Sequence, residues 1–487
     1  MRSQKQPKQD IVEVPATIEA VCPSATTVLA SSVGPVSEAA SPSLAEAGHV
    51  ALPRLSVPDR QQLLSPITID DLLEAGHPAR AVWSYVLALD LTPLYDRIRA
   101  RGRVAGRPAI DPRLLVALWL YATLAGFTSA RELADLCNRH DAFRWLVGGV
   151  SVNHHTLSDF RADHLEFVGQ LLKQSVEVLR QQGLIDLDRV AQDGMRVRAS
   201  AGAASFRRAE TLERLLQEAQ AELRLLKQQQ AAALTDPIAA QEVATKQGSP
   251  AGEAEPSRQE QAAAMRCAED RVERVEEALA RIPEMEAKIE PGDSKEARVS
   301  TTDPQATVMK MADGGFRPAY NIEYSTTCDG QVIVGVDVVT VGSDQGQLPP
   351  MLDQIEDRFE QRPKEALVDG GFANQKDIEQ VQGGEKPCKV YAPVVKPRKA
   401  GVDRYEPKAT DSKEVAEWRK RMGTEEAKKI YKERAATAEC VNAQARNRGL
   451  KQLTVRGIEK VKAIASWFAV THNMARSFAL HPQPAAI

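Results

Sequence analysis

Two short segments, far apart in the chain, share a pattern of apolar residues that leads to an aspartate followed by glycine. One spans 187–194 and contains Asp193, and the other spans 365–371 and contains Asp369. The alternating apolar residues of the first and the continuous apolar run of the second predict β-strands. A strand that stops at a carboxylate and then a glycine places a negative charge at a sheet edge, where a large ligand can approach the backbone. The rest of the chain must fold so that these two strands have partners.

The segments between the two aspartates predict a mixed α/β sheet. Two strands flank the turn Asp329-Gly330, which is a strong hairpin signal, and an amphipathic helix spans 347–359. The order is strand, insertion, strand, strand, helix, strand and helix, which is that of an RNase H-like core. In such a core the first and fourth strands are neighbours, so Asp193 and Asp369 are expected to meet. The catalytic domain is expected to span 184–480.

Heptad patterns predict a helical insertion at 205–295, inside this domain. Leucines and alanines from Leu212 to Leu226 are spaced four and three residues apart, and a second seam runs from Met265 to Ile282. Such seams are typical of coiled coils. The two helices are expected to form an antiparallel hairpin, although the seams equally suit dimerisation.

The N-terminal part divides into two regions by composition. Residues 1–60 are rich in Ala, Ser and Pro, a composition that cannot bury enough apolar surface to offset the ordering entropy, so a disordered tail is expected. Residues 61–183 predict short helices joined by tight turns, the last of them starting near Thr156 and running to Gln182. This pattern suits an all-α, helix-turn-helix-like DNA-binding domain, and a plain helical bundle equally well. A short tail, 481–487, is expected at the other end.

Charge and cysteine content restrict the partners and the compartment. The net charge is −3, so a nucleic-acid partner must contact local basic stretches. The segment 431–480 holds nine Lys and Arg against three Glu, and a second basic stretch contains Arg103 and Arg107. Six scattered cysteines without a CxxC pair, and no apolar run of membrane-spanning length, predict a cytoplasmic protein without disulfides.

A helix near the C-terminus completes a candidate metal site. Glu439 lies at helical distances from Tyr431 and Arg446, on roughly one face. Three carboxylates can hold two Mg²⁺ or Mn²⁺ ions, with Asp193 bridging them, Asp369 on one and Glu439 on the other. Further phosphate contacts are expected from the same segment: Arg434, Arg448 and Lys451. Taken singly, the aspartates equally suit turns before glycine, and Glu439 an exposed helical acid.

Several motifs together resemble the DDE transposases of bacterial insertion sequences, specifically the eleven-eighty-two group with relatives in the four and five groups. The resemblance covers most of residues 60–480. It rests on the following stretches: His77-Pro78-Ala79-Arg80, Gly106-Arg107-Pro108, the segment 152–161 (VNHHTLSDFR), Gln192-Asp193-Gly194, the segment 301–306 (TTDPQA), Ala319-Tyr320-Asn321, Val368-Asp369-Gly370-Gly371-Phe372, Tyr431-x-x-Arg434 with Glu439, Arg456-Gly457-x-x-Lys460-Val461 and His472-Asn473.

This resemblance implies that the two aspartates and the glutamate bind metal, and that the helical N-terminal part binds element ends. It implies cleavage of DNA, transfer of the freed 3′-hydroxyl to target DNA, and a homodimer or larger synaptic assembly. Two departures concern the glutamate. Arg446 stands where the family has Lys, and four residues rather than three separate Arg434 from Glu439. Glu433 and Glu459 therefore stay open as alternatives. An RNase H-like nuclease without strand transfer, and an inactive DNA-binding regulator, are the rival functions.

Overall fold

The computed structural model describes residues 68–98, 100, 108–235, 257–289, 296–397, 401 and 403–481. The expected disordered tail, the basic residues Arg103 and Arg107, and residues 482–487 lie outside the described residues. From Pro66 onward, the contacts join the chain into one compact unit.

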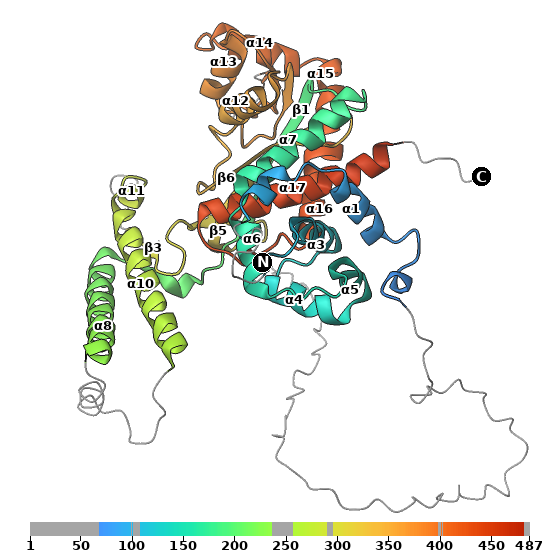
Figure 1. Ribbon diagram of the computed structural model, residues 1–487. Helices are drawn as coiled ribbons and strands as arrows, with labels where there is room; N and C mark the ends of the chain where they lie inside the picture. Colours follow the sequence, from blue (N-terminus) through green and yellow to red (C-terminus); the bar gives the residue numbers. More distant parts are fainter. Residues whose placement is uncertain are drawn as a thin grey trace, which may run out of the picture. The chain divides into compact units, whose positions relative to one another are not determined.

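A mixed sheet forms the centre of the described structure (Figure 1). Its strand order is β6, β5, β1, β7, β8, and β4 pairs with β5 on the same side as β6. β1 is antiparallel to β5 and parallel to β7, which is parallel to β8. The strands have the following bounds: β1 (Arg189–Arg198), β4 (Thr307–Lys310), β5 (Phe316–Thr327), β6 (Ile333–Val339), β7 (Glu365–Leu367) and β8 (Lys389–Tyr391).

The predicted pairing of the first and fourth strands of the core is present, since β1 and β7 are neighbours. Ala191 pairs with Leu367 at the last position of this parallel ladder. Asp193 and Asp369 each lie two residues further along, and side chains two residues apart on a strand point to the same side. Because neighbouring strands are about 4.8 Å apart, continuing this register brings the two carboxylates to one edge.

The predicted hairpin is also confirmed. β5 and β6 are antiparallel around the turn that contains Asp329 and Gly330, with Asn321 opposite Val339. Gly330 has no room for a side chain, because a Cβ there would lie 2.4 Å from Cγ2 of Ile185. The helix α12 (Leu348–Phe359) follows as predicted and packs on β6.

Helices precede the sheet from residue 78 to residue 181. Their bounds are α1 (Pro78–Leu87), α2 (Thr92–Asp96), α3 (Pro112–Ala125), α4 (Ala130–Arg139), α5 (Asp141–Val147), α6 (His154–Ala162) and α7 (Leu165–Gln181), after a 3₁₀ turn η1 (Asp70–Leu72). The Ser129 side chain accepts a hydrogen bond from the Glu132 amide and caps α4. The single long helix expected from Thr156 to Gln182 is wrong, because the chain breaks at Asp163 and His164.

The C-terminal helix α17 (Ile458–Leu480) joins these helices to the sheet. It packs against α3, α7 and β6 (Figure 1). Trp467 is 1% exposed, and its indole nitrogen donates to the carbonyl of Arg161 in α6. One apolar cluster therefore contains residues of the N-terminal helices, α17 and β1 together. The boundary at residue 183 and the helix-turn-helix function stay predictions.

The insertion forms the predicted antiparallel hairpin of helices. α8 (Ala209–Thr235) and α10 (Arg258–Ala280) pack side by side (Figure 1). Leu212 and Val275 are buried between them, and Arg271 forms an ion pair with Glu222 across the pair at 2.8 Å. Short elements flank the hairpin: η2 (Ala203–Ser205), β2 (Phe206–Arg207), α11 (Ile282–Glu286) and β3 (Val299–Ser300), with β2 paired to β3. Dimerisation through the seams is untested.

The segment 387–424 contains both a strand and a helix. β8 forms the edge strand of the sheet beside β7, and α14 (Lys413–Met422) packs against α13 (Gln375–Gly383). Val390 and Trp418 are buried in the same apolar cluster as β7. The remaining elements are α15 (Glu425–Arg434), the π-helical turn η3 (Ala435–Glu439) and α16 (Cys440–Asn447).

In the described part of the chain, no single helix is long and apolar enough to cross a membrane; only the bent pair of α3 and α4, at 99°, passes on length and composition. The cysteines resolved there, Cys137, Cys267, Cys328, Cys388 and Cys440, are free thiols.

Candidate active site

Asp193 and Asp369 come together at the edge of the sheet where β7 ends. Both line one cavity of about 420 Å³. Burial raises the pKa of the Asp193 carboxyl, the Arg434 guanidinium opposes this shift, and the negative charge of Asp369 adds to it. The two aspartates are therefore close enough to interact electrostatically.

Arg434 lies between Asp193 and Glu439. Its Nη2 is 3.1 Å from Oδ1 of Asp193, and its Nη1 donates to Oε1 of Glu439 at 2.6 Å. The side chain of Arg434 is 9% exposed, that of Asp193 17%, and that of Glu439 54%. One guanidinium thus holds a buried and an exposed carboxylate together. Contact between Arg434 and DNA stays a prediction, since both carboxylates engage it here.

The π-helical turn explains the additional residue between Arg434 and Glu439. In an α-helix, the residues that face each other are three or four apart. A π-helix closes its hydrogen bonds five residues apart, and Arg434 and Glu439 have this separation. The turn η3 therefore absorbs one residue and keeps the Arg434–Glu439 pair on one face. The expectation that Tyr431, Glu439 and Arg446 share one face assumed regular α-helical spacing, which this turn interrupts, so it stays a prediction.

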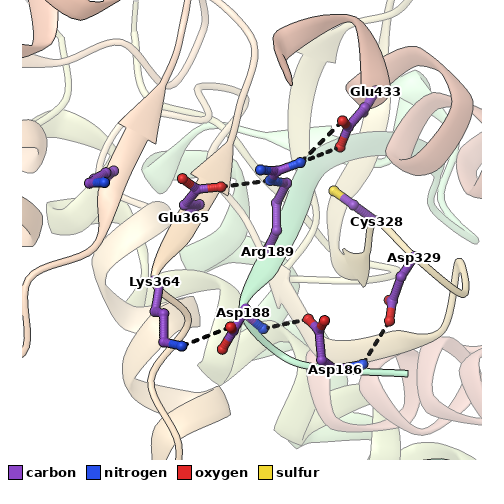
Figure 2. Close-up of a pocket in the computed structure, with 9 residues that line it drawn as sticks. Asp186, Asp188, Arg189, Cys328, Asp329, Lys364, Glu365 and Glu433 are labelled. Atoms are coloured by element: carbon purple, nitrogen blue, oxygen red, sulfur yellow. Dashed lines mark hydrogen bonds and ion pairs between the residues drawn. The ribbon is translucent and has the colours of Figure 1, made fainter. Parts of the chain in front are cut away.

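The other two glutamates of this region lie in different surroundings. Glu433 forms an ion pair with Arg189 at 2.8 Å, and Arg189 also pairs with Glu365. Figure 2 shows Arg189 between these two carboxylates, in a pocket at the start of β1. Asp193 lies four residues further along the strand, and the cavity that it lines is a different one. Glu459 is exposed in the first turn of α17. Only Glu439 shares a cation with Asp193.

Asn442 supports Asp193 from the next helix. Its Nδ2 donates to Oδ2 of Asp193 at 3.0 Å, and the side chain is 2% exposed. Asp193 therefore has one oxygen on Arg434 and the other on Asn442, so both oxygens are fixed before any ligand binds. Sequence reasoning missed Asn442, which lies three residues after Glu439.

Basic side chains line the same cavity as the two aspartates. Arg446 and Lys451, both expected to contact phosphate, are exposed and form part of its wall. Three further arginines of the wall were not expected from the sequence: Arg196, Arg198 and Arg317. The juxtaposition of carboxylates and cations suits a phosphodiester, whose negative charge the basic groups can bind. Arg448 is half-buried and is not among the lining residues, and Tyr431 is half-buried beside the carboxylates and Arg434.

A third aspartate, Asp344, also lines the cavity and was not expected from the sequence. It lies in the loop between β6 and α12, where it accepts a hydrogen bond from Asn321 at 2.7 Å. Asn321 belongs to the Ala319-Tyr320-Asn321 motif, so that motif was the available signal. Glu323, two residues further along β5, is 1% exposed and accepts from the same amide at 2.8 Å. Burial raises the pKa of Glu323 well above its ordinary value, and Asp344 adds to the shift.

The donor atoms suit hard divalent cations, which prefer carboxylate oxygens. Among the described residues, however, no three His, Cys, Asp or Glu side chains converge closely enough to hold a metal ion. Arg434 accounts for part of this separation, because its guanidinium occupies the space between Asp193 and Glu439. The two carboxylates already bind one positive group, the guanidinium of Arg434. Metal binding at Asp193, Asp369 and Glu439 therefore requires side-chain rotation.

Comparison with known proteins gives two family matches. Residues 67–163 match the model described as Transposase domain (DUF772), and residues 388–478 match the Transposase DDE domain. The first match contains α1 to α6, and the second contains Tyr431, Arg434, Glu439 and Arg446. No curated protein and no solved structure matches the chain.

Both matches agree with the cavity, in which carboxylates and cations face each other. Transposases act on DNA, and DDE transposases are nucleotidyl-transfer enzymes that generally use divalent metal ions. The chain is therefore similar to transposases over these two segments, and the second segment is similar to a DDE domain.

Proposed function

We propose that this protein cleaves DNA at the ends of its mobile element and joins the freed 3′-hydroxyl to target DNA. The observation that carries the proposal is the shared cavity, in which Asp193 and Asp369 face Arg446 and Lys451. The parallel pairing of β1 with β7, next to the antiparallel β5 and β6, supports an RNase H-like core.

In this proposal Asp193, Asp369 and Glu439 hold two Mg²⁺ or Mn²⁺ ions, with Asp193 between them. Bound ions of this kind activate the attacking oxygen and stabilise the leaving oxygen of an in-line displacement. Asn442 fixes the orientation of Asp193 through its 3.0 Å hydrogen bond. Arg434 neutralises Asp193 and Glu439 in this structure, and it would have to release at least one of them for that carboxylate to hold an ion.

The basic wall of the cavity positions the DNA strand. Arg446 and Lys451 bind phosphates beside the cleaved bond, and Arg446 can hold a phosphate through two parallel hydrogen bonds. Tyr431 and Arg448, which are half-buried outside the cavity wall, are proposed as further DNA contacts of the same segment, and Arg103 and Arg107 as contacts from the N-terminal region. The helices that match the first transposase domain bind the element ends, and two or more subunits hold both ends together.

The test is metal-dependent cleavage of DNA that contains the sequences flanking the coding region. We expect Asp193→Asn and Asp369→Asn each to abolish cleavage while DNA binding persists, because the amide keeps the size of the side chain and loses the charge. Asp313→Asn is the matched control, since Asp313 lines the same cavity but is exposed and paired with Arg317. Cleavage by either purified Asp193 or Asp369 variant contradicts the proposal.

The same assay selects among the three glutamates. We expect Glu439→Gln to abolish cleavage, and Glu433→Gln and Glu459→Gln to retain it. Loss of cleavage in Glu433→Gln alone would assign the metal to the other end of β1. A strand-transfer reaction on a target plasmid separates transposition from hydrolysis, because a nuclease gives cut products without joined ones.

A further inference from the structure

Asp344 lies beside both candidate metal ligands, although it is far from each in sequence. It lines the cavity together with Asp193 and Asp369, whereas Glu439 is not among the lining residues. The sheet explains the position, because β6 ends near the edge where β7 ends and the connection to α12 passes there. The cavity therefore contains three carboxylates of different strands and loops, in addition to Asp313 on its rim.

Two glycines show how closely Asp344 approaches the aspartates. Gly194 directly follows Asp193, and a Cβ there would lie 2.6 Å from Oδ1 of Asp344. Gly371 follows Asp369 by two residues, and a Cβ there would lie 3.0 Å from Oδ2 of Asp344 and 2.9 Å from Oδ1 of Asp369. The position that a Cβ of Gly371 would occupy therefore lies beside one oxygen of Asp344 and one oxygen of Asp369. The absence of a side chain at both glycines is what allows Asp344 to enter.

A buried amide fixes Asp344 and leaves one of its own atoms without a partner. Asn321 is 0% exposed, and its Nδ2 donates to both Asp344 and Glu323. Among the described residues, its Oδ1 accepts no hydrogen bond, and the same holds for Oε1 of the buried Gln192, which donates to Glu323. Buried carbonyl oxygens without a donor are costly. Their presence next to three carboxylates indicates that the cluster accepts a further positive or hydrogen-donating group.

We propose that Asp344 supplies an additional carboxylate oxygen to the divalent-cation site that contains Asp193 and Asp369. This inference depends on the proposed function, and it adds a ligand that neither the motifs nor the family matches assign. Arg434 forms an ion pair with Asp193, whereas no ion pair among the described residues involves Asp344 or Asp369. These two carboxylates repel each other unless a cation binds between them, and carboxylate oxygens are the preferred ligands of Mg²⁺ and Mn²⁺. Rotation of the carboxylates completes the site, since they do not converge fully in the present arrangement.

The direct test is Mn²⁺ binding to the full-length protein, followed by electron paramagnetic resonance of the free ion without DNA. We expect Asp344→Asn to weaken Mn²⁺ binding by about 10-fold or more, because loss of a group that only supports a metal ligand already costs about 10–100-fold in affinity. Asp313→Asn is the control with unchanged affinity. Asp369→Asn tests the proposed site itself, and circular dichroism checks that each variant is folded.

A cysteine variant separates a ligand from a residue that only supports the loop. Asp344→Cys is expected to bind Cd²⁺ with an additional cadmium–thiolate absorption band relative to the wild type, because cadmium prefers sulfur. Asp313→Cys should lack the band. Wild-type affinity in Asp344→Asn, together with weak binding in Asp369→Asn, overturns the role of Asp344 and leaves the proposed function standing. Unchanged Mn²⁺ binding in Asp369→Asn and Asp193→Asn overturns the metal site of the proposed function, and the role of Asp344 with it.

Discussion

Removal of the Arg434 guanidinium should destabilise the protein through the charge that it leaves behind on Asp193. Arg434 and Asp193 are 9% and 17% exposed at their side chains, so this ion pair is largely out of water. Replacement by methionine in Arg434→Met keeps much of the apolar stem and deletes the charge. Among the described side chains, Asp193 then keeps the hydrogen bond from Asn442 at 3.0 Å and no other.

The expected magnitude follows from burial. Removal of one partner of a buried ion pair lowers the free energy of unfolding by about 3–5 kcal/mol. The lower end of this range applies here, because Asp193 keeps one hydrogen bond and is partly exposed to solvent. Arg434→Met is therefore expected to lower the free energy of unfolding by about 3 kcal/mol. The second pair of Arg434 contributes little, since the Glu439 side chain is 54% exposed and exposed pairs are worth about 0.2–1 kcal/mol.

A double-mutant cycle isolates the interaction. Asp193→Asn added to Arg434→Met removes the stranded charge, so the double variant should regain about 2 kcal/mol relative to Arg434→Met alone. Urea unfolding, followed by tryptophan fluorescence in the presence of EDTA, measures each variant without metal. Equal stability of Arg434→Met and the wild type, or a double variant less stable than Arg434→Met, would refute the buried pairing of Arg434 with Asp193.

Three further predictions concern pH, salt and the π-helical turn. Burial lowers the pKa of His472 from 6.5 to about 4; the unfolded chain then binds the proton first, so about 3 kcal/mol of stability is lost as the pH falls through this range. In His472→Gln this contribution should be absent, which is checked by comparing the urea midpoints of the variant and the wild type at a pH above 6.5 and at a pH of about 4. Arg446→Ala and Lys451→Ala should each reduce the slope of log affinity for DNA against log salt by about 1, and an unchanged slope excludes a phosphate contact. Deletion of Ala436 should retain cleavage, because it converts the π-turn to an α-helix of ordinary spacing, whereas deletion of Ala443 in the regular α16 should abolish cleavage.

The sequence predicted the strands whose signals are local. The hairpin of β5 and β6 follows from alternation around Asp329 and Gly330, and the order of elements predicted that β1 and β7 are neighbours. These features depend on short-range patterns and on the few topologies that connect them. The meeting of Asp193 and Asp369 at one cavity is therefore predictable from the sequence.

Other parts depend on tertiary contacts that leave weak local signals. β8 is three residues long and is specified by pairing with β7 and packing against α14, and the break between α6 and α7 at Asp163 has no proline or glycine. The position of Asp344 is set by the hydrogen bond from Asn321 and by the space at Gly194 and Gly371. A loop residue of this kind is found only when distant strands are assembled.

The most direct test of the account is strand transfer by the purified protein. The substrate is DNA from the flanks of the coding region, with Mg²⁺ and a supercoiled target plasmid. We expect the wild-type protein to join a 3′ end of this DNA to the plasmid, and Asp369→Asn to give no joined product although it still binds the DNA. Joined product from Asp369→Asn, at the wild-type yield, would contradict the claim that Asp193 and Asp369 form one catalytic site.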